Sequence, residues 1–166
     1  MIRSILYATD LGLYAPYVLQ HALALARAFR AELHVIHAVE PISLLAESVL
    51  KSYLDRDTLD EIRSKGLSTV MSSIEQRVLD AFRDELDDTC DDMAMIRAVR
   101  VLQGDPPQVI LDEAKRLAVD LLVIGSHSQG MELEVPMGRT AQRLLQLAEV
   151  PVYLVPMLQH RERGEG

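Results

Sequence analysis

A loop that carries glycines follows an uninterrupted apolar run in the C-terminal half of the chain. The run Leu121–Ile124 ends at Gly125, and Gly138 precedes the next helical pattern. A strand that ends in a glycine loop and leads into a helix can direct backbone N–H groups and the positive end of the helix toward an anion. Gly125 and Gly138 therefore predict a binding site for a phosphate group.

A carboxylate follows the first apolar run of the chain, Ile2–Ala8, in the segment Thr9–Gly12. In doubly wound sheets, ligands bind at the carboxyl ends of strands where the strand order reverses. If the first and fourth strands are neighbours, Asp10 and the glycine loop flank one crevice. Asp10 could there accept a hydrogen bond from a ribose or an adenine edge. The alternative is that Asp10 caps the turn after the first strand.

The histidines offer weaker candidates for chemistry. His127 lies in the glycine loop, but the sequence places no cysteine or serine–carboxylate pair beside it. A general base needs a positioned partner, so a solvated loop histidine is the preferred interpretation. His34 and His37 are three residues apart in one predicted strand and face opposite sides, which predicts packing roles. We expect neither a catalytic residue nor a metal site.

Five apolar runs alternate with helical patterns. Strands are expected at Ile2–Ala8, Leu33–Val39, Ile96–Leu102, Leu121–Ile124 and Pro151–Val155. Helices are expected from Pro16, from Leu59 to the acidic run ending at Asp92, from Pro106 with Asp105 as N-cap, and over Ala141–Ala148. Residues 41–57 fit either a short helix or a loop. The alternation predicts an α/β protein with a doubly wound, five-stranded parallel sheet and helices on both faces.

Bulk properties limit the partners of the chain. Its 166 residues fit one domain, expected at 1–157, followed by a polar tail at 158–166. The net charge of −8 and the pI near 5.1 argue against nucleic acid. No run reaches the roughly 20 apolar residues of a membrane span, and no signal peptide opens the chain. Cys90 alone forms no internal disulfide, which suits a reducing compartment, so a cytoplasmic protein is expected.

Several segments in this order and spacing resemble the universal stress protein family over residues 1–157. They are Ile5–Asp10, Leu33–His37, Gly104–Pro106, Asp120–His127 and Val150–Pro156. The resemblance implies a five-stranded parallel α/β sandwich of the adenine nucleotide alpha hydrolase-like, or Rossmann-like, type. It also implies a homodimer, often paired through the last strand, here Pro151 to Val155. Some members bind ATP or AMP, and others bind no nucleotide.

The glycine loop departs from the pattern of the nucleotide-binding members. They show a glycine, two residues, a second glycine, nine residues, and then a glycine followed by serine or threonine. Here Gly125 and Gly138 match, whereas Ser128 replaces the second glycine and Arg139 replaces the late hydroxyl residue. Arg139 could bind a phosphate through its guanidinium fork, with Thr140 supplying a hydroxyl.

Carried over position by position, the resemblance implies two groups of ligand-contacting residues. The adenosine side would be contacted by Ala8, Asp10 and Ala38. The loop and phosphate side would comprise Ile124, Gly125, Ser126, His127, Ser128, Gly138, Arg139 and Thr140. The ligand would be ATP, accompanied by Mg²⁺, or AMP. Two loop carboxylates, Glu132 and Glu134, oppose a triphosphate unless they face water or hold a metal.

Two functions remain open at this point. The first is a dimeric stress-response module that binds an adenine nucleotide without being an enzyme, because the chain shows neither a P-loop lysine nor a positioned base. The second is a member that binds no nucleotide and acts through protein contacts alone. A phosphorelay receiver domain is rejected, since Asp10 is solitary and Lys115 lies in a predicted helix rather than after a strand.

Overall fold

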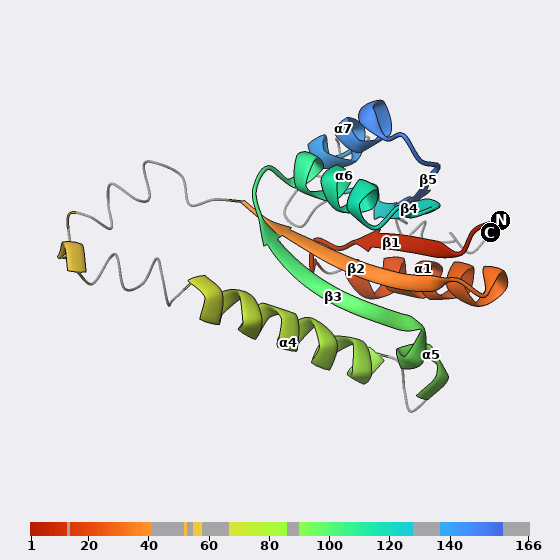
Figure 1. The fold of residues 1–166 in the computed structure, drawn as a ribbon, viewed down its shortest axis with the longest axis horizontal. Helices are drawn as coiled ribbons and strands as arrows, with labels where there is room; N and C mark the ends of the chain where they lie inside the picture. Colours follow the sequence, from red (N-terminus) through yellow and green to blue (C-terminus); the bar gives the residue numbers. More distant parts are fainter. Residues whose placement is uncertain are drawn as a thin grey trace, which may run out of the picture.

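The computed structural model describes residues 1–12, 14–40, 52, 55–57, 67–85, 90–127 and 137–157. Strands and helices alternate along the chain (Figure 1). The strands are β1 (Ser4–Ala8), β2 (Glu32–Val39), β3 (Ile96–Gln103), β4 (Leu121–Gly125) and β5 (Val152–Val155). The main helices are α1 (Ala15–Phe29), α4 (Leu67–Glu85), α5 (Cys90–Met95), α6 (Pro106–Arg116) and α7 (Arg139–Leu147).

The five strands form one parallel sheet in the order β3-β2-β1-β4-β5. The predicted fold class is confirmed. β1 pairs with β4, which is the arrangement on which the predicted crevice was conditional, and Ala8 lies opposite Ile124. Successive strands extend the sheet in one direction from β1 and in the other direction from β4. The strand order therefore reverses between β1 and β4, which is where sheets of this type bind ligands.

Helices cover both faces of the sheet, and strand residues alternate between the two resulting cores. One core contains Ile5 and Val123 and packs against α1 and α4. The other contains Leu6 and Leu122 and packs against α6 and α7. Figure 1 shows α6 and α7 together on one side of the sheet and α1 and α4 on the other. Burial on both faces explains why the central strands are continuous apolar runs.

Element boundaries differ from the sequence predictions in a few places. β1 begins at Ser4 rather than Ile2, and at its start the N–H groups of Arg3 and Ser4 donate to the Asp120 side chain. The acidic run after α4 leads into a separate helix, α5, that was not predicted. Met93 and Met95 of α5 pack against the core on the α1 side.

Parts of the remaining predictions lie outside the described residues. These parts are most of 41–57, the start of the helix expected from Leu59, the polar tail and the loop positions 128–136. Within the described residues, none of the helices has the length and apolarity needed to cross a membrane.

The start of α6 has a tight local geometry. Gly104 has φ +155°, and a Cβ atom there would lie 2.5 Å from Cγ2 of Val109, so this turn requires glycine. Pro106 occupies the first turn of α6, as predicted. Asp105 is the N-cap residue, but its side chain makes no capping hydrogen bond. The glycine turn therefore sets where the α6 N-terminus lies beside the end of β2.

A buried carboxylate fastens α6 onto β3. Glu113 is 4% exposed and accepts hydrogen bonds from Arg100 at 2.6 Å and from Arg116 at 2.9 and 2.7 Å. The hydrogen bonds from Arg116, followed by those from Arg100, lower the pKa of Glu113 against the opposing effect of burial. A buried charge is tolerated here because both carboxylate oxygens are paired.

Asp120 joins the amino ends of β1 and β4. Its Oδ2 accepts hydrogen bonds from the N–H groups of Arg3 at 2.8 Å and Ser4 at 3.1 Å. Its own N–H donates to the carbonyl of Ser4 at 2.8 Å. The two accepted backbone hydrogen bonds, first Arg3 and then Ser4, lower the pKa of Asp120.

Replacing Asp120 with asparagine is expected to lower the Tm at neutral pH, because the amide accepts these bonds more weakly than a carboxylate. A carboxyl whose pKa is lower in the folded state stabilises the fold above its unfolded pKa of about 3.9, and this contribution disappears as pH falls through the folded pKa. The Tm difference between wild type and Asp120→Asn should thus shrink between pH 7 and pH 3 in thermal melts. A difference independent of pH would contradict this role.

Candidate functional site

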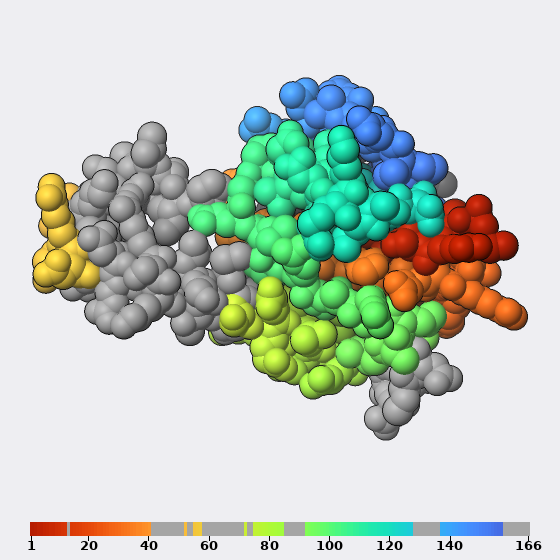
Figure 2. All heavy atoms as spheres, in the orientation of Figure 1, coloured from red at the N-terminus to blue at the C-terminus, as the bar shows by residue number. Residues whose placement is uncertain are grey.

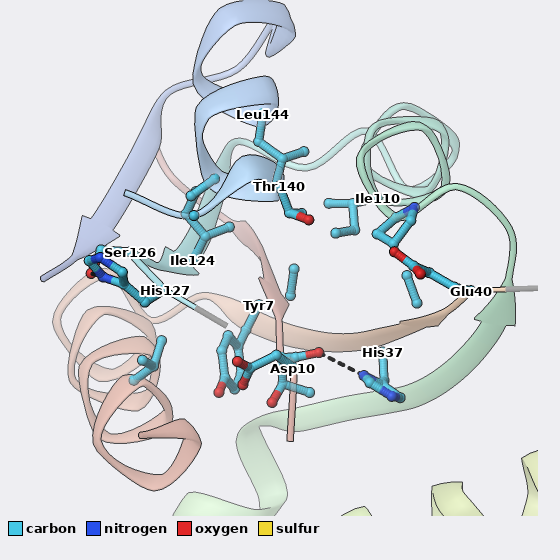
Figure 3. Close-up of a pocket in the computed structure, with 18 residues that line it drawn as sticks. Tyr7, Asp10, His37, Glu40, Ile110, Ile124, Ser126, His127, Thr140 and Leu144 are labelled. Carbon is cyan, nitrogen blue, oxygen red and sulfur yellow. Dashed lines mark hydrogen bonds between the residues drawn. The ribbon is translucent and has the colours of Figure 1, made fainter. Parts of the chain in front are cut away.

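A cavity of about 260 Å³ lies at the carboxyl ends of β1 and β4 (Figure 3). Both halves of the sheet and the helices α1, α6 and α7 contribute to its walls. The lining residues are Tyr7, Ala8, Thr9, Asp10, Val18, His37, Ala38, Glu40, Pro106, Ile110, Ile124, Gly125, Ser126, His127, Gly138, Thr140, Ala141 and Leu144. Its volume is close to the lower end of the range for small-molecule sites, about 300–1,000 Å³.

Most of the residues singled out from the sequence meet in this cavity. Those that line it are Ala8, Asp10, Ala38, Ile124, Gly125, Ser126, His127, Gly138 and Thr140. Arg139 is exposed at the first residue of α7 and lies outside the lining. Ser128 lies outside the described residues. The cavity itself is a finding of the structure, whereas the ligand contacts of these residues stay predictions.

Four polar residues that line the cavity were not among the predicted ligand contacts: Tyr7, Thr9, His37 and Glu40. His37 was assigned to strand packing and Glu40 was not singled out, yet both line the cavity at the end of β2. Their position gave a usable signal, because all parallel strands end at the same edge of the sheet. Any polar residue directly after β2 was therefore a candidate once β2 was placed next to β1.

The loop after β1 is held by its own side chains. Asp10 Oδ1 accepts a hydrogen bond from Gly12 N–H at 2.8 Å, and Thr9 Oγ1 accepts one from Leu11 N–H at 3.1 Å. Leu11 has φ +59°, a left-handed conformation that costs about 1–2 kcal/mol for a residue with a Cβ atom. Asp10 therefore caps this turn, and the same residue lines the cavity.

His37 has a defined tautomer in this setting. Its Nδ1 lies 2.9 Å from the carbonyl oxygen of Thr9. A carbonyl only accepts hydrogen bonds, so Nδ1 carries the proton and donates it. In the neutral ring, Nε2 is then a hydrogen-bond acceptor.

Ser126 ties the end of β4 to β5 and to α7. Its N–H donates to Val155 O at 2.9 Å, and its carbonyl accepts from Gly138 N–H at 2.8 Å. Its Oγ accepts from Met157 N–H at 2.9 Å and lies 2.8 Å from Nδ1 of His127. Two of the backbone amides that the glycine loop suggested for a phosphate, those of Ser126 and Gly138, are thus already used within the fold.

The first turn of α7 supplies the remaining backbone donors at this end of the cavity. The first hydrogen bond within the helix runs from Gln142 N–H to Gly138 O at 3.0 Å. The N–H groups of residues 139–141 precede it, and such groups have no acceptor within their own helix. Gly138, the N-cap, contributes no side chain to this end. The helix dipole adds partial positive charge in the same place.

Gly125 leaves room where β4 enters the cavity. A Cβ atom at this position would lie 3.3 Å from Cγ2 of Val18 on α1, which is closer than most Cβ contacts. Any side chain larger than alanine would extend into the cavity or displace α1. Glycine here keeps the crevice open between β4 and α1.

Tyr7 positions α1 and is unsuited to acid–base chemistry. Its side chain is 1% exposed, and its hydroxyl donates to Ala15 O at 3.0 Å. Burial is the main cause that raises the pKa of Tyr7 far above its usual value. The phenol therefore stays protonated and holds the first turn of α1 beside the cavity.

The charged side chains in the described lining are acidic. Asp10 and Glu40 carry carboxylates, and none of the lining residues listed above is a lysine or an arginine. Among the described residues, no group of three or more histidine, cysteine, aspartate or glutamate side chains could hold a metal ion. The positive potential in this part of the cavity comes from the α7 N-terminus rather than from a basic side chain.

Sheet order and cavity position define a doubly wound α/β protein of the Rossmann-like type, with a crevice at the point where the strand order reverses. The model of the universal stress protein family matches residues 1–156. The chain belongs to the universal stress protein family.

Curated relatives support this membership. The protein called "universal stress protein in QAH/OAS sulfhydrylase 3′ region" from Thermus aquaticus is 27% identical over 158 residues, which are 93% of this chain and 99% of that protein. The stress response protein NhaX of Bacillus subtilis is 30% identical over 57 residues, and the match spans 34% of each chain.

Solved structures share the fold at low identity. The hypothetical protein MJ0577 aligns with a TM-score of 0.64 and 20% identity, covering 96% of this chain and 99% of that one. A universal stress protein in complex with cAMP aligns with a TM-score of 0.57 and 15% identity, covering 93% and 97% of the two chains.

Proposed function

We propose that this protein is a dimeric stress-response module that binds an adenine nucleotide in the crevice between β1 and β4. The observation that carries the proposal is the cavity at the reversal of strand order, with Asp10 on one wall and the α7 N-terminus on another. A related fold with cAMP bound supports the choice of an adenine nucleotide. We expect the protein to act in the cytoplasm and without catalysis.

The two sides of the cavity suit the two parts of a nucleotide. The α7 N-terminus, where Gly138 leaves room and Thr140 supplies a hydroxyl group, would receive a phosphate. Ala8, Ala38 and Asp10 would contact the adenosine. Arg139, exposed at the first residue of α7, would approach a phosphate from outside the cavity.

Both AMP and ATP remain candidate ligands. AMP brings one phosphate to a site whose described lining contains no basic side chain, whereas ATP brings a longer negative chain. Asp10 and Glu40 do not form a metal site in the described residues, so Mg²⁺ would enter as a companion of ATP. We therefore expect AMP to bind at least as tightly as ATP.

The second candidate function is a family member that acts through protein contacts alone. The internal hydrogen bonds of Ser126 and Gly138 favour it, because they satisfy within the fold two amides that a phosphate would otherwise use. The absence of a basic side chain from the described lining points the same way. Nucleotide titration separates the two candidates.

The dimer would form through β5, the edge strand beside β4. An edge strand offers unpaired N–H and C=O groups along its outer side. Tyr153 of β5 is 36% exposed, and its hydroxyl lies 3.1 Å from Nδ1 of His21 on α1. The Tyr17 and His21 rings meet edge to face, with centroids 4.8 Å apart. This aromatic cluster widens the surface that β5 presents to a second copy.

Substitution at the cavity should remove nucleotide binding. Valine at Gly125 would place methyl groups in the crevice, and glutamate at Arg139 would oppose a phosphate at the α7 N-terminus. A ligand at a hundred times its Kd stabilises a fold by about 2.7 kcal/mol, which raises the Tm by several degrees. We expect ATP and AMP to raise the Tm of wild type and to leave that of Gly125→Val and Arg139→Glu unchanged.

Arg143→Glu is the matched control, because Arg143 is exposed one turn further along α7 and changes the net charge equally. This variant should keep the nucleotide-dependent shift. If Gly125→Val and Arg139→Glu both keep it as well, the ligand does not occupy this crevice. If wild type shows no shift and no heat of binding with either nucleotide, the second candidate function is the better account.

Sedimentation velocity tests the proposed dimer. Tyr153→Glu places a charge on the edge strand and removes the contact with His21, so the variant should sediment as a monomer while wild type sediments as a dimer. Phe29→Glu is the control, because Phe29 is an aromatic residue at the far end of α1 that is 41% exposed. A dimer that persists in Tyr153→Glu would rule out this interface.

A further inference from the structure

The cavity has two chemically different ends. Figure 3 shows Glu40 on the side of Ile110, across the cavity from Ser126 and His127. The end at Ser126 adjoins Gly138, whose N–H bonds to the Ser126 carbonyl, and thus the α7 N-terminus, which favours negative charge. The end at Glu40 carries a carboxylate, which disfavours negative charge. A nucleotide in this cavity would therefore place its phosphate toward α7 and its base toward Glu40.

The side chains at the Glu40 end accept hydrogen bonds. A carboxylate is an acceptor only. His37 already donates its Nδ1 proton to Thr9 O at 2.9 Å, so its neutral ring offers Nε2 as an acceptor. Ile110 and Pro106 supply apolar surface to the cavity, and Ile110 lies on the side of Glu40 in Figure 3. This end therefore suits a planar ligand with apolar faces and hydrogen-bond donors on its edge.

We propose that Glu40 is a specificity-determining residue that recognises the base by accepting a hydrogen bond from the exocyclic amino group of a 6-aminopurine. This inference rests on the proposed function and adds to it the chemical group of the base by which the site selects its ligand. The amino group of adenine is a donor that matches the carboxylate, and the ring faces match the apolar surfaces of Ile110 and Pro106. A hydrogen bond to a charged acceptor is stronger than one between neutral groups.

The charge of Glu40 also repels the phosphate of every nucleotide in the cavity, and the strength of this repulsion depends on the distance between the two groups. This effect is the same for two ligands with the same phosphate, so it cancels in the ratio of their affinities. The ratio of the Kd values of two monophosphates that differ only in the 6-amino group therefore isolates the recognition of the base.

Isothermal titration with AMP and with purine riboside 5′-monophosphate, which lacks the 6-amino group, tests the inference on the full chain. We expect wild type to bind AMP about five- to tenfold more tightly, as a charge-assisted hydrogen bond at a partly exposed site predicts. Glu40→Ala should reduce the ratio to below about twofold. Glu40→Gln keeps a neutral acceptor and should give an intermediate ratio.

Glu32→Ala is the matched control, because Glu32 is an exposed carboxylate at the opposite end of β2 and its removal changes the net charge equally. It should leave the ratio at the wild-type value. Equal binding of the two ligands by wild type, or an unchanged ratio in Glu40→Ala, overturns the role of Glu40 while leaving nucleotide binding intact. Failure of both ligands to bind overturns the proposed function and the role of Glu40 together.

Discussion

The pairing of β1 with β4 is the constraint on which the rest of the molecule depends. The chain leaves β1 toward α1 on one face of the sheet and leaves β4 toward α7 on the other face. The helices that follow these two strands lie on opposite faces of the sheet, and a cavity lies at the carboxyl ends of the strands. Asp120 fixes the same strand pair at its opposite end through its bonds to Arg3 and Ser4. In Figure 2, α6 and α7 cover one face of this assembly.

The ligands that the cavity could bind depend both on the polar groups in its described lining and on the cationic side chains absent from that lining. Its described lining holds two carboxylates, two imidazoles and no lysine or arginine, and Ser126 has its N–H, C=O and hydroxyl groups engaged within the fold. A phosphate would depend on the α7 N-terminus and on Arg139, as a nearby exposed cation. The side of the cavity that carries the carboxylates would bind a ligand through hydrogen-bond donors on the ligand. The proposed preference for a 6-aminopurine nucleotide arises from this polarity.

The fold class, the helices on both faces of the sheet and most of the residues that line the cavity could be predicted from the sequence. Apolar runs, glycine turns and parallel connections left only a few possible strand orders, and the structure decides among them. The position of Arg139 outside the cavity lining could not be predicted. Tertiary packing decides on which side of the helix start an exposed side chain lies. Glu40 was missed because its place in the cavity depends on which strand lies next to β2 rather than on any local motif. The helix α5 was missed because the acidic run was interpreted as the end of the preceding helix, although two methionines of α5 pack on the core.

A crystal structure of the protein grown with AMP would test the central claim most directly. The account predicts that the phosphate lies against the N–H groups of the first turn of α7 and that the 6-amino group lies within hydrogen-bonding distance of Glu40. A cavity between β1 and β4 that contains only solvent at saturating AMP would contradict it. The protein would then act through its surface rather than through a bound nucleotide.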